Sequence, residues 1–233
     1  MASGTTRSQP DAELGSSDSQ PSGLAPWLAT HCPAEILAAL LTVTPEELTE
    51  AAITALGRRG GPEHCSVLVP LLHCDSDRVA ALAEDSLWRL WLRGGSPQAT
   101  RALAEAIELV QANRLSEALM ALDRLALAEP TFAEVHNQRG IALCLLGRLD
   151  EAAEAFREAL RHNQHHFSAA VSLAHTYAQR GQLRPALRQY RRALQINPRL
   201  DGVREIVERL EAIVGDGSVS PCLLYTSPSP RDS

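Results

Sequence analysis

The stretch HNQRGIALCLLGRLDEAAEAFREAL, residues 136–160, decides the fold because its pattern returns along the chain. A later copy, SLAHTYAQRGQLRPALRQYRRALQINP, spans residues 172–198, and a degenerate earlier copy, ALAEAIELVQANRLSEALMALDRLALAEP, spans residues 102–130. A fixed period with small residues at fixed places predicts stacked helical hairpins. The residues that keep a step of 34 include Ala106, Gly140 and Ala174; Leu115, Leu149 and Leu183; Ala118, Ala152 and Ala186; and Leu122, Phe156 and Tyr190.

The types of residue at the repeated places explain how the hairpins pack. Gly140 and Ala152 are small because we expect two antiparallel helices to cross closely there. Phe156 and Tyr190 are expected to fill the space between successive hairpins. A single hairpin cannot bury its apolar face alone, so neighbouring hairpins stack into a continuous array. The predicted fold class is therefore all-α, an α-solenoid, which offers a binding surface and no catalytic chemistry of its own.

These segments resemble tetratricopeptide repeats. The resemblance implies three repeats within residues 96–200, at about 99–132, 133–166 and 167–200. The first repeat departs from the family pattern, since Leu125 replaces the usual small residue. Residues 201–215 follow with apolar side chains at helical spacing and charged residues on the other face, which predicts a capping helix.

Residues 26–95 show a weaker repeat and resemble short HEAT-like repeats of the phycobilisome lyase type. The marks are an Ala-Leu-Gly helix end, Gly-Pro-Glu, a leucine-rich segment, and Asp-x-Asp before an alanine-rich helix. Thr44 and Glu47 form a predicted capping box. A helix is expected from Glu63 to Leu72, and Asp77 is expected to cap the helix after it. The alternative is an undefined helical cap on the solenoid.

The two ends of the chain are excluded from the fold. Residues 1–25 are rich in Ser, Gly, Asp, Gln and Pro and are expected to be a disordered tail. Residues 216–221 are expected to be a linker. The segment CLLYTSPSPRDS, residues 222–233, resembles the translation of a sequencing adapter. The natural protein is therefore expected to extend beyond about Pro221.

Composition excludes several classes of function. The formal charge of −6 argues against a general nucleic-acid binder. The five cysteines match no zinc or disulfide spacing and are read as free thiols in a reducing compartment. No apolar run approaches the length of a membrane span, and no secretory signal is present, so cytoplasm is the predicted location. Neither catalytic motifs nor phosphate-binding loops occur, so we predict no enzyme activity, catalytic residue, cofactor or metal site.

The family resemblance implies a concave groove lined by the first helix of each hairpin. The groove is mostly apolar and suits an amphipathic helix or an extended apolar peptide. The alternative is that its first three residues pack on the preceding HEAT-like helices. The implied groove positions are Leu103, Ile107, Val110, Asn137, Ile141, Cys144, Leu145, Val171, His175 and Gln179.

A partner class is excluded by the same comparison. Tetratricopeptide repeats that bind chaperone tails hold a terminal carboxylate with lysine, arginine and asparagine on the groove helices. None of the matching places here supplies a cation, so a carboxylate would lose its charge-assisted hydrogen bonds. We therefore predict no binding to the C-terminal tails of heat-shock chaperones. The matching places are Leu103, Ile107, Gln138, Ser168 and Ser172.

Two further clusters carry weaker signals. Arg184, Arg188, Arg191 and Arg192 share one helical face, which indicates either a patch for an acidic partner or RNA, or a solvated convex face. His162, His165 and His166 are expected at a helix end, where imidazoles favour the negative terminus.

The predicted function is a protein–protein interaction scaffold. One alternative is the regulatory N-terminal arm of a longer enzyme, since such repeats precede catalytic domains in several bacterial families. The other alternative is a module that binds anions or RNA through the arginines.

Overall fold

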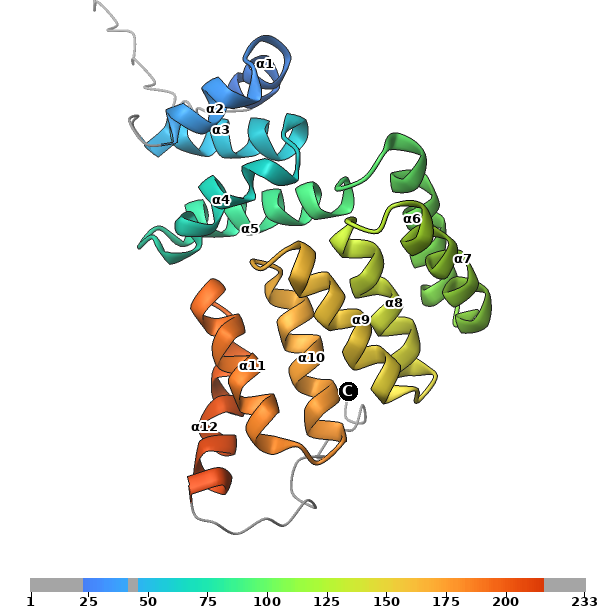
Figure 1. Ribbon diagram of the computed structural model, residues 1–233. Coiled ribbons are helices and arrows are strands. Elements are labelled where there is room, and N and C mark those ends of the chain that lie inside the picture. The colour runs from blue at the N-terminus through green and yellow to red at the C-terminus, as the bar shows by residue number, and fades with distance from the viewer. Residues whose placement is uncertain (1–22, 42–45, 216–233) are drawn as a thin grey trace, which may run out of the picture.

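The computed structural model describes residues 23–41 and 46–215, which form helices and turns without a strand (Figure 1). No helix within these ranges is long and apolar enough to cross a membrane. The predicted all-helical α-solenoid is confirmed. The helices are α1 (Leu24–His31), α2 (Ala34–Leu40), α3 (Glu46–Arg59), α4 (Cys65–Leu68), α5 (Asp77–Leu92), α6 (Pro97–Gln111), α7 (Leu115–Ala128), α8 (Ala133–Leu145), α9 (Leu149–His162), α10 (Phe167–Gln179), α11 (Leu183–Ile196) and α12 (Asp201–Gly215), with 3₁₀ turns η1 (Pro62–His64) and η2 (Val69–His73).

Three antiparallel hairpins, α6–α7, α8–α9 and α10–α11, form the repeat array, and α12 packs against α11. Each hairpin turns at the same place in the period. There the backbone of Asn113, Gly147 and Gly181 has φ of 57°, 74° and 70°. Positive φ costs glycine little and is tolerated by asparagine, which explains the residue types at the recurring turn.

The small residues of the period mark the close helix crossings. Gly140 on α8 faces the ring of Phe156 on α9, and both residues are fully buried or nearly so. A Cβ atom at Gly140 would lie 2.6 Å from Cε1 of Phe156, well inside van der Waals contact. A glycine is therefore required where the two helices of the second hairpin cross.

The N-terminal unit, α1 to α5, forms its own core around Leu37, Ile53, Leu56, Leu68 and Leu87. Several local predictions for this unit need correction. Helix α1 begins at Leu24, inside the segment expected to be disordered.

The expected helix from Glu63 to Leu72 is broken into η1, α4 and η2, because Pro70 cannot donate a backbone hydrogen bond. The cap of α5 is Ser76, whose hydroxyl accepts from the amide of Val79, and Asp77 is the first helical residue. The predicted capping box of Thr44 lies outside the described residues.

The N-terminal unit lies across one edge of the repeat array (Figure 1). Helix α5 runs over the loops that join one hairpin to the next and contacts α8. Phe167 and Ile196, from the two ends of the third repeat, belong to the same buried cluster as Leu90 and Trp91 of α5. The core of the N-terminal unit thus continues into the loop edge of the array.

Candidate binding face and the junction behind it

The predicted groove residues of the second and third repeats lie on one surface, here called the α8/α10 face. Ile141 and Cys144 of α8 and Val171 of α10 are half-buried and pack against one shared cluster. Cys144 Sγ lies 3.3 Å from Thr176 Oγ1, which joins the two helices there. The remaining members are exposed: Leu145 (58% exposed), His175 and Gln179.

The members of the α8/α10 face carry no formal charge at neutral pH. His175 packs edge-on against Tyr190 at 5.3 Å between ring centroids, and partial burial lowers the pKa of His175 below its usual 6.5. Burial likewise raises the pKa of the Cys144 thiol. An imidazole and a thiol with these shifts are both neutral at pH 7. The face therefore favours an apolar or uncharged partner.

The other four predicted groove residues are not part of this face. Leu103 is buried, and Ile107 and Val110 are half-buried, all within a cluster formed with Leu122 and Phe132. The described members of that cluster all come from the repeats, which speaks against the alternative of packing on the preceding helices. Asn137 is also buried, and its Nδ2 donates to Glu134 at 3.1 Å. These four positions contribute to packing beside the α8/α10 face.

A buried pair, Glu134 and His166, lies behind this surface. Both side chains are fully buried, and His166 Nε2 lies 2.7 Å from Glu134 Oε2. His166 Nδ1 accepts from the amide of Ala169, so the imidazole caps α10 and Nε2 carries the proton. The sequence interpretation placed His166 at a helix C-terminus, which is wrong, because this residue is the N-cap of α10.

Glu134 is stabilised as a carboxylate. Burial alone would raise the pKa of Glu134, but the hydrogen bond from His166 and attraction to its ring oppose this effect. Gln138 and Asn137 donate to the other carboxylate oxygen, at 2.7 Å and 3.1 Å. Together these contacts hold the pKa below its usual 4.5.

The junction between the N-terminal unit and the repeats was not predicted. The ring of His166 stacks on Trp91 of α5, with centroids 4.2 Å apart and an interplanar angle of 20°. Trp88 and Phe167 complete the aromatic cluster with edge-on contacts. A sequence signal was present, since Phe132, His166 and Leu200 share one place in the period.

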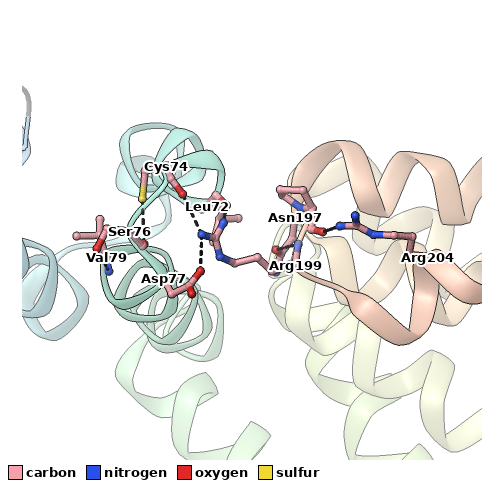
Figure 2. A network of polar contacts seen from close by, with 9 residues as sticks. Leu72, Cys74, Ser76, Asp77, Val79, Asn197, Arg199 and Arg204 are labelled. Atoms are coloured by element: carbon pink, nitrogen blue, oxygen red, sulfur yellow. Dashed lines mark hydrogen bonds and ion pairs between the residues drawn. The ribbon is translucent and has the colours of Figure 1, made fainter.

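Arg199 makes the most extensive polar contact of this junction (Figure 2). Its Nη1 donates to the carbonyl of Leu72, and its Nη2 donates to the carbonyl of Cys74 and to Asp77, each at 2.9 Å. Asn197 Nδ2 donates to Glu84 Oε2 at 3.0 Å in the same region. The loop after α11 is thereby fastened to η2 and α5.

A cleft of about 350 Å³ lies between the N-terminal unit and the loops of the first two repeats. Its lining includes Cys65, Trp91, Phe132, His162 and His165. Burial raises the pKa of the Cys65 thiol to about 11, so the group is not a nucleophile at neutral pH. Within residues 23–41 and 46–215, His, Cys, Asp and Glu form no group of three or more able to hold a metal ion.

The predicted arginine patch is divided in the structure. Arg191 pairs with Glu211 of α12 at 2.8 Å, and Arg192 donates to the carbonyl of Gln164 at 3.3 Å. Arg184 and Arg188 are exposed and have no ion pair among the described residues. Two of the four arginines therefore contribute to contacts between elements.

Comparisons with known proteins agree with this architecture. The tetratricopeptide repeat family matches residues 133–166 and residues 167–200. A search of curated proteins gave no significant match. Among solved structures, the first tetratricopeptide repeat domain of Spaghetti (RPAP3), bound to the HSP90 peptide SRMEEVD, has a TM-score of 0.50 at 16% identity. The match covers 52% of this chain and 96% of that chain.

Two more solved structures are similar at a lower level. YrrB, described as a TPR protein with an unusual peptide-binding site, has a TM-score of 0.45 at 20% identity and covers 79% of this chain and 88% of its own. TTC0263, a thermophilic TPR protein from Thermus thermophilus, has a TM-score of 0.40 at 20% identity and covers 82% and 97%. The family matches, together with the helical hairpins at the same places, show that residues 133–166 and 167–200 are tetratricopeptide repeats.

Proposed function

We propose that this protein is a non-catalytic interaction scaffold that binds an apolar peptide or a partner helix on the concave side of its repeats, at the α8/α10 face. Tetratricopeptide repeats are in general protein-interaction modules, and repeat arrays commonly bind through their concave surface. The observation that carries the proposal is the apolar set Ile141, Val171 and Leu145, which is at least partly exposed and lies beside the neutral polar members of that face. The RPAP3 domain, which shares the fold, is bound to a peptide in its structure.

Charged substitutions on the α8/α10 face should abolish this binding. We expect peptides selected from a random library on the full chain to lose at least about 100-fold in affinity in the Ile141→Glu, Val171→Glu variant, because an apolar peptide would have to bury an unpaired carboxylate. Titration calorimetry measures the loss.

The matched control is Met120→Glu, Leu127→Glu, which places the same charges on exposed apolar positions of α7. Both variants must keep the helicity and melting temperature of the wild type. Selected peptides that bind the α8/α10 variant with unchanged affinity would contradict the proposed site.

The proposal also predicts no recognition of acidic chaperone tails. The peptide SRMEEVD should show no saturable binding, because a carboxylate needs cationic donors and the matching positions supply none. Leu103 is buried, and Gln138 already donates to Glu134. Fluorescence polarisation with labelled peptide tests this, with the RPAP3 domain as positive control, and micromolar binding to the wild type would show the prediction to be wrong.

A second candidate function, binding of RNA or another anion, rests on Arg184 and Arg188, which are exposed and have no ion pair among the described residues. Such binding would weaken steeply as salt is added, since it releases counterions from the nucleic acid. Affinity for single-stranded RNA that is independent of salt would remove this candidate.

A further inference from the structure

We infer that α5, together with the turns directly before and after it, is a brace that fixes the curvature of the repeat array by joining three successive repeat junctions. The residues of α5 that contact the repeats share one face, because Asp77, Glu84, Trp88 and Trp91 are separated by seven, four and three positions. Their partners lie in the loops between hairpins, which come at matching places in the 34-residue period. This role stands whether or not the α8/α10 face binds a peptide.

The N-terminal end of α5 is fastened at the junction between the third repeat and α12. Arg199 reaches two backbone carbonyls and Asp77 (Figure 2). In addition, Asn197 reaches Glu84. His73 Nε2 lies 3.2 Å from the carbonyl of Ile196 and donates to it. The guanidinium contributes most to this contact, because its fork satisfies two carbonyls at once and Asp77 is largely exposed.

The last turns of α5, which hold Trp88 and Trp91, lie on the junction between the second and third repeats. Trp91 stacks on His166, which caps α10, and Trp88 and Trp91 both contact Phe167. The rings of Trp88, Trp91 and Phe167 belong to or adjoin the core of the N-terminal unit. A rotation of the third repeat against the second would therefore disturb a buried aromatic cluster.

The C-terminal end of the brace meets the junction between the first and second repeats. Gly94 and Gly95, directly after α5, lie against the ring of Phe132, the residue that precedes α8. A Cβ atom at Gly95 would overlap that ring, whereas a Cβ atom at Gly94 would lie 3.1 Å from it. The close approach at Gly95 thus completes a third point of attachment.

Three attachments along α5 and its flanking turns restrict the rotation between neighbouring repeats, which other repeat arrays leave free. In a solenoid each repeat contacts only its neighbours, so small rotations at each junction change the curvature. Helix α5 has 16 residues and is about 24 Å long. The attachments extend past both ends of this helix, from the carbonyl of Leu72 before its start to Gly95 after its end.

The brace predicts that loss of its anchors widens the distribution of distances across the array. Spin labels are attached to ketone-bearing residues at the exposed positions Met120 on α7 and Glu208 on α12, which leaves the native cysteines unchanged. Double electron–electron resonance should give one narrow distance in the otherwise wild-type chain. In Arg199→Met the width should increase at least roughly twofold, because the junction between the third repeat and α12 then loses its main attachment to η2 and α5.

Two further variants make the test specific. Arg204→Met is the matched control, because Arg204 donates to the carbonyl of Pro198, which lies in the same loop as Arg199 (Figure 2). This variant should leave the distance distribution narrow. Gly95→Ala places a methyl group against the Phe132 ring and so releases the other end of the brace. This variant should also widen the distance distribution. An unchanged narrow distribution in both Arg199→Met and Gly95→Ala, at wild-type helicity, would overturn the inference. An already broad distribution in the wild type would overturn it too.

Discussion

Replacing Glu134 with alanine should lower the free energy of unfolding by about 3–5 kcal/mol, since one partner of a buried, hydrogen-bonded pair is removed. The substitution leaves the Nε2–H of His166 without its acceptor, and Asn137 and Gln138 lose theirs as well. Thermal unfolding followed by circular dichroism should show a melting temperature lower by about 10 °C or more.

The control for this result is Glu154→Ala. Glu154 forms an exposed ion pair with Arg157 within α9, and such pairs contribute about 0–1 kcal/mol. A loss in Glu134→Ala no larger than the loss in Glu154→Ala would show that the buried pair does not stabilise the fold.

Acid titration checks the same pair independently. The pKa of Glu134 is lowered in the folded protein, so its stabilisation is present above about pH 4.5 and is lost as pH falls through the lower folded pKa. The wild type should therefore lose more stability over this acidic range than Glu134→Ala does. If the free energy of unfolding fell equally with pH in the two proteins, the assignment of Glu134 as a buried carboxylate would be contradicted.

Phe156→Ala should cost about 3–5 kcal/mol, because it removes a buried ring from the crossing of α8 and α9 and leaves a cavity. Urea unfolding measures the change. Gly140→Ala alone should cost about 1–3 kcal/mol, since the new methyl group overlaps the Phe156 ring.

The double variant distinguishes this contact from general loss of packing. Without the ring, the methyl group at position 140 enters vacated space, so Gly140→Ala should cost little in the Phe156→Ala background. The two substitutions are therefore expected to be strongly non-additive. Simple addition of the two losses would mean that Gly140 is small for another reason.

The sequence was sufficient to predict the hairpins because their packing is local and periodic. Gly140 and Phe156 each have counterparts 34 residues away, and both are buried at the predicted crossing of α8 and α9. The residue types at the turns, Asn113, Gly147 and Gly181, also match the positive φ found there. The same residue types recur at the same contact in each repeat, so the contact can be predicted even when one repeat departs from the pattern.

The junction was not predicted because the residues that make its contacts differ in type from one repeat to the next. Phe132 and His166 occupy the same place in the period, but one is an apolar ring and the other an imidazole. Arg199 lies at a different place in the period. His166 lies near two other histidines in sequence, which favoured the interpretation as an exposed helix end. Its true environment depends on Trp91 and Glu134, which lie 75 and 32 positions away. The roles of the predicted binding residues on the α8/α10 face stay predictions until a partner is measured.

The contact between Arg199 and Leu72 also affects the order in which parts of the protein fold during synthesis. These residues are separated by 127 positions, whereas ordinary repeat arrays gain most contacts within and between adjacent repeats. Trp88 and Trp91 leave the ribosome well before their partners, at about 5–20 residues per second. For some seconds the nascent chain therefore presents an apolar helix edge, which is covered only when the last hairpin folds against it.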